Sequence, residues 1–214
     1  MANDEYAYVG RWCGPNGIAT ADLIAADWII TAPHVAENKI RKPASVDVTV
    51  CFTGPGGDIS AKVVEAFERC RNPEYPWTEI NLARLDRRID DIQIIALAKD
   101  ALSSGQEITI DIVGTTIKQR PILGGSCKLH DNGRYLIRTT NGNHQHANQN
   151  DSGGAWLIRQ RNGGHVLVGI MQGLTDKSDP YSGAATQPAV RSEWINKQLA
   201  DFGAKATWVA VDYR

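Results

Sequence analysis

Short segments rich in β-forming residues, separated by turn residues, recur along this chain at intervals of roughly ten residues, and this pattern restricts the fold most. Trp28–Thr31, for example, is too short for a helix and favours a strand. Asp131-Asn132-Gly133 is a strong hairpin signal. The pattern favours an antiparallel barrel or sandwich over a sheet of βαβ units. Strands are expected at Tyr6–Val9, Ala19–Ala25, Trp28–Ala32, Ser45–Phe52, Ile59–Phe67, Glu79–Leu85, Ile92–Leu97, Ile108–Val113, Ile117–Gln119, Ser126–His130, Arg134–Thr139, Trp156–Arg159, His165–Met171 and Ala206–Val211.

The length of the chain, 214 residues with 42% hydrophobic, permits a sizeable core in one large all-β unit or in two small subdomains. The charged segment Arg87–Asp91 is where we place the boundary between two halves, about residues 1–90 and 91–190. One helix is expected in the remaining part, 191–214. It begins with Ser192 as N-cap and stops at Gly203. Its apolar face consists of Trp194, Ile195, Leu199 and Phe202.

Charge and hydropathy exclude two classes of partner. The formal net charge is -1 with no sustained basic run, which argues against a nucleic-acid surface. No stretch approaches the roughly 18 apolar residues that span a membrane. The segment Met1–Glu5 has neither the basic nor the apolar part of a signal peptide, so we expect a soluble, untargeted protein.

Cysteine spacing gives no indication of a metal centre. Four cysteines lie far apart, at Cys13, Cys51, Cys70 and Cys127. None forms a Cys-x-x-Cys pair, and His144 and His146 have no cysteine at zinc-finger spacing, so no metal and no cofactor is expected. The even number permits two disulfides, while buried or half-buried thiols in a reducing compartment are an equal alternative.

The segment Asn148–Trp156 carries the clearest chemical signal. Ser152 lies between Asp151 and the pair Gly153-Gly154, directly before an apolar run. This pattern indicates a hydroxyl on a tight turn whose backbone N–H groups face outward, which is what acyl transfer requires. The alternative is a simple polar turn between two strands.

His34 follows the expected strand Trp28–Ala32, at the point where the chain turns. Its ring is expected at the edge of the core with one nitrogen reaching a cleft, and a hydrogen-bonded structural histidine is the alternative. An acidic residue on a strand and then Ser152 follow His34 in chain order.

Taken together, these segments resemble those of the trypsin-like (chymotrypsin-fold) serine proteases. Asp22–Val35 is similar to the family's histidine motif and Asp151–Gly154 to its serine motif. Val168–Gly173 resembles the strand that lines the substrate cleft, and Trp194-Ile195 resembles the start of the closing helix. The resemblance covers about Tyr8 to Phe202 and implies two six-stranded antiparallel β-barrels with a C-terminal α-helix.

Chain order separates this family from the α/β-hydrolases. Those enzymes use Gly-x-Ser-x-Gly and place the acid and the histidine after the serine. Here Asn150 replaces the first glycine, and the clearest histidine comes first.

The resemblance implies a serine endopeptidase that acts on a protein or peptide. His34 would remove the hydroxyl proton of Ser152, which then attacks a peptide carbonyl. The backbone N–H groups of Asn150 and Ser152 would stabilise the oxyanion. Asn150 departs from the family's glycine, although Asn tolerates positive φ better than most residues.

Two registers can supply the third member of the triad. Either Glu79–Arg87 or Asp91–Ile95 could match the acid-bearing strand of the family. We prefer Glu79, because that register continues without gaps and leaves the usual spacing from His34 to the acid. Its carboxylate would accept the imidazole Nδ1–H if the backbone retreats by about one methylene. Asp91 is the alternative acid, and Glu79 would then be a solvated acid at a strand start.

Specificity is indicated only weakly. Register from Ser152 places His146 near the base of the primary pocket, where trypsin-like enzymes have Asp. This argues against preference for Arg or Lys and is compatible with acidic or polar side chains. Gln172, Gly173 and Gly183 are expected to form the pocket walls.

Two further departures bear on origin and activation. The start of the chain shows no Ile-Val segment to pair with Asp151, and Val35 replaces the cysteine that follows the histidine in extracellular relatives. A bacterial or intracellular, cytoplasmic protein is favoured. A non-catalytic binding or regulatory module of the same fold is the competing hypothesis, and the oligomeric state is left open.

Overall fold

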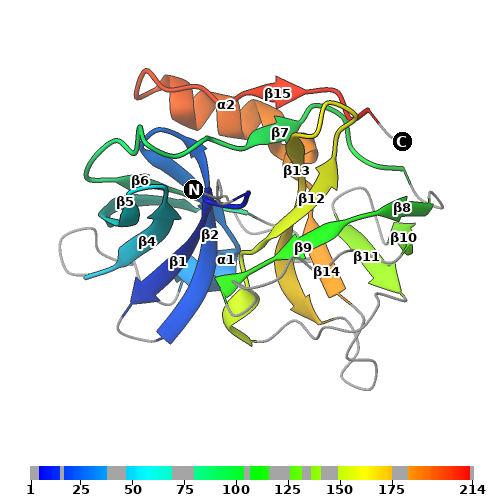
Figure 1. Ribbon diagram of the computed structural model, residues 1–214, viewed down its shortest axis with the longest axis horizontal. Helices are drawn as coiled ribbons and strands as arrows, with labels where there is room; N and C mark the ends of the chain where they lie inside the picture. Colours follow the sequence, from blue (N-terminus) through cyan, green and yellow to red (C-terminus); the bar gives the residue numbers. More distant parts are fainter. Residues whose placement is uncertain are drawn as a thin grey trace.

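The computed structural model describes residues 5–14, 17–37, 47–68, 80–103, 107–115, 126–131, 136–140, 149–174 and 183–212. Its elements are β1 (Val9–Gly14), β2 (Gly17–Ala25), β3 (Trp28–Thr31), α1 (Pro33–Glu37), β4 (Thr49–Gly54), β5 (Gly57–Glu68), β6 (Asn81–Leu85), β7 (Ala96–Ala98), β8 (Glu107–Thr109), β9 (Asp111–Val113), β10 (Ser126–Asp131), β11 (Leu136–Thr140), η3 (Gln149–Asp151), β12 (Ala155–Arg159), β13 (His165–Leu174), β14 (Gly183–Thr186), η4 (Pro188–Arg191), α2 (Ser192–Ala200) and β15 (Trp208–Val209). Figure 1 shows β1–β6 on one side of the molecule, the second sheet on the other, and α2 along one edge.

The N-terminal strands form a closed antiparallel barrel in the order β1-β2-β3-β6-β5-β4. Pairing of β1 with β4 closes it, with Trp12 opposite Val50. Trp12, Trp28 and Phe52 are fully buried, and each stabilises the barrel by roughly 3 kcal/mol through burial of apolar surface. The short, β-rich segments in the first half therefore form the barrel that their pattern predicts.

The second half forms one sheet in the described part of the chain. Its main path runs β15-β7-β13-β14-β11-β10-β8, and β12 joins β13 to β9. Most of these pairs are antiparallel, while β7 pairs parallel with both β13 and β15. A mostly β fold is confirmed, and closure of this sheet into a second six-stranded barrel stays a prediction.

The two halves share a core. One cluster of buried side chains joins barrel residues such as Leu23 to Leu157 and Leu167 of the second sheet, and to Ile195 and Leu199 of α2. The C-terminal helix therefore binds across both halves, as its apolar face predicts. Among the described residues, no helix has the length and apolar content needed to cross a membrane.

Both ends of α2 differ from the prediction. Ser192 is the first helical residue and Arg191 is the N-cap. Phe202 lies beyond the last helical residue and is 44% exposed. It packs against Trp28 and Phe67, with ring centroids 5.4 Å and 5.5 Å away, so it fastens the segment after the helix to the barrel.

Several predicted strand limits are wrong. Residues 5–8 form a turn, and β1 begins at Val9. The apolar run Ile92–Leu97 forms a strand only from Ala96 onward. The N–H of Ile95 donates to Leu23 O of the barrel at 3.1 Å and so is not available to the second sheet. The predicted strand Ala206–Val211 is reduced to Trp208–Val209, and that at Ile117–Gln119 lies outside the described residues.

Asp22 is an unusual residue for the middle of a barrel strand. Its side chain is fully buried, and neither carboxyl oxygen has a hydrogen-bond partner among the described residues. The phenol oxygen of Tyr8, in the turn that precedes β1, is also buried and has no hydrogen-bond partner among the described residues. Burial raises the pKa of Asp22 well above its ordinary value, because the ionised form cannot be solvated there.

We expect Asp22→Asn to stabilise the protein increasingly as pH rises. Unfolded Asp loses its proton near pH 4, while the buried carboxyl retains it until the higher folded pKa, so wild-type stability falls by about 1.4 kcal/mol per pH unit between the two. Asp22→Asn has no ionisable carboxyl at this position, so its stability does not fall with pH for this reason. Urea unfolding at pH 4 and pH 8 measures the difference. The exposed Asp100→Asn is the control, and an equal gain at both pH values for Asp22→Asn would contradict the account.

Candidate active site

Ser152 lies in the turn between η3 and β12, and hydrogen bonds hold three consecutive carbonyl groups of this turn. Asn150 O accepts from Thr20 Oγ1 at 3.2 Å. Asp151 O accepts from Gly154 N–H, and Ser152 O accepts from Thr20 N–H, each at 2.9 Å. We refer to Asn150–Gly154 as the serine turn.

The hydrogen bond to Asp151 O fixes the direction of the next amide. In a trans peptide the C=O and N–H point in opposite directions. Because Asp151 O faces Gly154 N–H, the N–H of Ser152 points away from that contact. The serine turn thus holds one of the two expected oxyanion donors in a defined orientation.

Gly153 explains why the turn needs glycine after the serine. Its φ is +86°, in the left-handed region. A Cβ atom there would overlap Thr20 O and Thr31 Oγ1 of the barrel. Its N–H donates to Met171 O at 2.8 Å, and Met171 N–H returns a bond to Gly154 O at 2.8 Å. The serine turn is therefore held between β2, β3 and β13.

His34 lies in the first turn of α1, directly after β3, and not at the end of a strand as predicted. Its side chain is half-buried, as is that of Ser152. Thr31 Oγ1, three residues before His34, donates to Thr20 O at 2.7 Å, and Thr20 N–H donates to Ser152 O. Two hydrogen bonds therefore connect the end of β3 to the serine turn, and the fold brings His34 and Ser152 to one region.

Of the two candidate acids, the structure describes only Asp91. Glu79 lies outside the described residues, but Asn81, two residues later, pairs with Thr31 near His34. Asp91 is exposed and follows the other end of β6. Nearby, Ile89 N–H donates to Ala26 O, at the β2–β3 turn.

Three of the expected substrate-pocket residues lie beside the serine turn. Gln172 occupies an irregularity in β13, where the register to β14 shifts between Met171 and Gly173. Gly173 pairs with Ala184, and Gly183, which is buried, pairs with Leu174. Because Met171 bonds directly to the serine turn, these residues are close to it in the sheet. His146 lies outside the described residues.

Asp151 faces the interior of the protein. Its side chain is fully buried, and a Cβ atom at Gly114 would overlap its carboxylate. The absence of a side chain at Gly114 therefore makes room for the acid that precedes Ser152.

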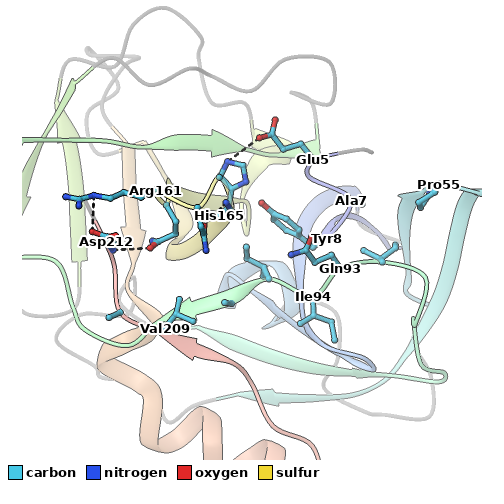
Figure 2. A pocket seen from close by; sticks show the side chains of 18 of the residues that line it. Glu5, Ala7, Tyr8, Pro55, Gln93, Ile94, Arg161, His165, Val209 and Asp212 are labelled. Atoms are coloured by element: carbon cyan, nitrogen blue, oxygen red, sulfur yellow. Dashed lines mark hydrogen bonds and ion pairs between the residues drawn. The ribbon is translucent and has the colours of Figure 1, made fainter. Parts of the chain in front are cut away.

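Figure 2 shows a pocket of about 1030 Å³ whose lining residues include Tyr8 and His165. Neither His34 nor any residue of the serine turn lines it. Its walls come from the N-terminal turn, the segment before β7, the β12–β13 turn and the C-terminal segment. Asp91 is one of its lining residues. This pocket is therefore distinct from the candidate active site.

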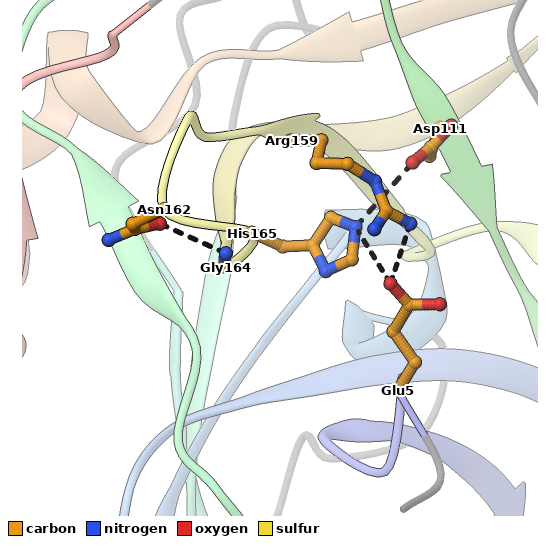
Figure 3. Close-up of polar contacts among 6 residues, drawn as sticks. All are labelled: Glu5, Asp111, Arg159, Asn162, Gly164 and His165. Carbon is orange, nitrogen blue, oxygen red and sulfur yellow. Dashed lines mark hydrogen bonds and ion pairs between the residues drawn. The ribbon is translucent and has the colours of Figure 1, made fainter.

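An ionic cluster borders that pocket and fastens the N-terminal turn to the second sheet (Figure 3). Arg159 donates to Glu5 at 2.6 Å. His165 Nε2 lies 3.5 Å from Asp111 and 3.7 Å from Glu5, which is longer than an ordinary hydrogen bond. Burial, and then the charges of Asp111 and Glu5, raise the pKa of Tyr6 to about 12. The arrangement is that of a structural ion network.

Sequence reasoning missed the threonines that surround the serine turn. Thr20, Thr31 and Thr115 were indistinguishable from ordinary strand-forming residues, because their partners lie far away in sequence. Among the described residues, no group of three or more His, Cys, Asp and Glu side chains could hold a metal ion.

Comparison with known proteins agrees with this geometry. The family model for trypsin matches residues 8–195. The solved structure of neuropsin, a serine protease expressed in the limbic system of mouse brain, matches with a TM-score of 0.65 at 18% identity and covers 92% of this chain and 96% of its own. At that identity the likeness shows a shared fold. No curated protein matches the sequence. The family model, which covers most of the chain, shows that this protein belongs to the trypsin-like (chymotrypsin-fold) family of serine proteases.

Proposed function

We propose that the protein is a serine endopeptidase that hydrolyses peptide bonds through Ser152, His34 and Glu79. The observation that carries the proposal is the serine turn itself: the hydrogen bonds of its carbonyls direct Ser152 N–H away from Gly154, beside a half-buried hydroxyl. Membership of the trypsin family supports the same reaction class.

The proposed mechanism is acyl transfer in two steps. His34 takes the proton of Ser152 Oγ as that oxygen attacks the substrate carbonyl, and later gives it to the leaving amine. The N–H groups of Ser152 and Asn150 stabilise the negative charge that develops on the carbonyl oxygen. Water, activated by His34, then releases the acyl group from Ser152.

Glu79 is our proposed acid because of the pairing of β6. Asn81 lies opposite Thr31, so the chain enters β6 near His34. Asp91 follows the far end of that strand and lines a separate pocket, which counts against it. The same proposal takes the halves before and after about residue 90 as two barrels that meet at the serine turn.

We expect Glu79→Ala to lower kcat by about 10³- to 10⁴-fold, because His34 would lose the group that fixes its tautomer. Asp91→Ala should retain wild-type kcat, since its carboxyl is solvent-exposed near the other pocket. Steady-state hydrolysis of one peptide by both variants decides between the registers. Full activity in Glu79→Ala with loss in Asp91→Ala would reverse the assignment.

Substrate preference is proposed to depend on Gln172, Gly173 and Gly183 as pocket walls and on His146 near the pocket base. A randomised peptide library tests both activity and preference. We expect cleavage by wild-type protein, no enrichment of Arg or Lys before the cleaved bond, and no cleavage by Ser152→Ala. Equal cleavage by wild-type protein and Ser152→Ala would contradict the proposed function.

A further inference from the structure

Thr20 belongs to the N-terminal barrel, but its polar atoms contact the serine turn of the other half. Its N–H donates to Ser152 O at 2.9 Å, and its Oγ1 donates to Asn150 O at 3.2 Å. These two carbonyls belong to the peptide groups on either side of the one that carries Ser152 N–H. A single buried residue therefore holds both neighbours of an expected oxyanion donor.

Thr115 holds the Thr20 hydroxyl from the second half of the chain. Its N–H donates to Thr20 Oγ1 at 2.9 Å, and the two hydroxyl oxygens lie 2.8 Å apart. Each hydroxyl has one proton to donate. If Thr115 donates to Thr20, the proton of Thr20 is available to Asn150 O, and each bond polarises the next.

The two hydroxyl protons can also be arranged so that the serine turn loses the hydrogen bond to Asn150 O. Thr115 Oγ1 also lies 2.8 Å from Ala19 O and can donate to it. Thr20 then donates to Thr115, and Asn150 O loses that donor. Because Thr20 is fully buried, bulk water does not compete for either position.

We propose that Thr20 is a positioning residue of the active site, whose hydroxyl, held by Thr115, fixes the Asn150–Asp151 peptide and thereby the direction of Ser152 N–H. The inference rests on the proposed peptidase function. Since the oxyanion exists only after attack on the carbonyl, loss of this hydroxyl should lower kcat and leave KM unchanged.

Thr20→Val tests the proposal, because valine has nearly the same shape and retains the backbone bond to Ser152 O. We expect kcat to fall about tenfold at unchanged KM, the effect of one lost hydrogen bond on the transition state. Thr20→Ser should return kcat to within about twofold of wild type, since it restores the hydroxyl. Thr53→Val, which removes the hydrogen bond from the Thr53 hydroxyl in β4 to Asp58 in β5, is the control with unchanged kcat.

Active-site titration by the acylation burst gives kcat per competent molecule, so partial unfolding does not imitate the effect. Thr115→Val is a second, independent variant, for which we expect kcat to fall about threefold. Thr20 then loses the hydroxyl that polarises it but retains its own hydroxyl as the donor to Asn150 O. Wild-type kcat per active site in Thr20→Val would overturn the proposal. So would a Thr20→Ser variant as slow as Thr20→Val, or, if Thr20→Val does not fold, an unchanged Thr115→Val.

The outcome also separates this inference from the function on which it rests. A wild-type protein that neither cleaves a peptide library nor gives an acylation burst with an activated ester would reject the peptidase function and this inference with it. A normal wild-type burst together with an unaffected Thr20→Val would reject the role of Thr20 alone.

Discussion

Ser152→Ala and His34→Ala should each lower kcat by about 10⁴- to 10⁶-fold, with little change in KM. The first removes the proposed nucleophile, and the second removes the base proposed to activate it. Because both groups act in one step, the double variant should be no slower than Ser152→Ala. Steady-state kinetics with one peptide substrate measure the three losses.

Ser103→Ala serves as the matched control, since Ser103 is exposed and lies far along the chain from the serine turn. It should retain wild-type kcat. Additive losses in the double variant would show that Ser152 and His34 act independently, and an active Ser152→Ala would remove Ser152 from the reaction.

Gly153→Ala should destabilise the protein by about 3 kcal/mol or more. Part of the loss comes from an alanine at φ +86°, which costs roughly 1–2 kcal/mol. The remainder comes from overlap of the new methyl group with Thr20 O and Thr31 Oγ1, both in the barrel. Urea unfolding measures the change in the free energy of unfolding.

Gly163→Ala separates the two contributions. Gly163 has φ +88°, but a Cβ atom there meets no atom within 4 Å. It should therefore lose only the conformational part, about 1–2 kcal/mol. Equal losses at Gly153 and Gly163 would show that the barrel yields to the methyl group and does not hold the serine turn tightly.

Local patterns predicted much of this fold. The strands expected at Ala19–Ala25 and Trp28–Ala32 are present as β2 and β3 with slightly different limits, because β-branched and aromatic residues flank a clear turn. By contrast, the sequence did not predict β14 (Gly183–Thr186), because glycine and alanine have low strand propensity. This segment becomes a strand by pairing with β11 and β13. The short helix that holds His34 was also missed, because a single turn has no periodicity to detect.

The candidate site shows the same division. Ser152 and His34 could be proposed from the sequence because the residues next to them, such as the glycines after the serine, form recognisable motifs. The contacts of Thr20 with Asn150 and Thr115 join positions 130 and 95 residues apart, so no local pattern reports them. Asn150 is part of the short helix η3, and its carbonyl accepts a hydrogen bond from Thr20 of the barrel.

Intact mass spectrometry after treatment with a fluorophosphonate tests the central claim most directly, because the reagent reacts with a serine only when a base and an oxyanion site activate it. We expect one adduct per wild-type molecule, located by peptide mapping at Ser152, and none in Ser152→Ala or His34→Ala. A wild-type protein that stays unlabelled under conditions that label a known serine protease would contradict the account. An adduct on another serine would contradict it as well.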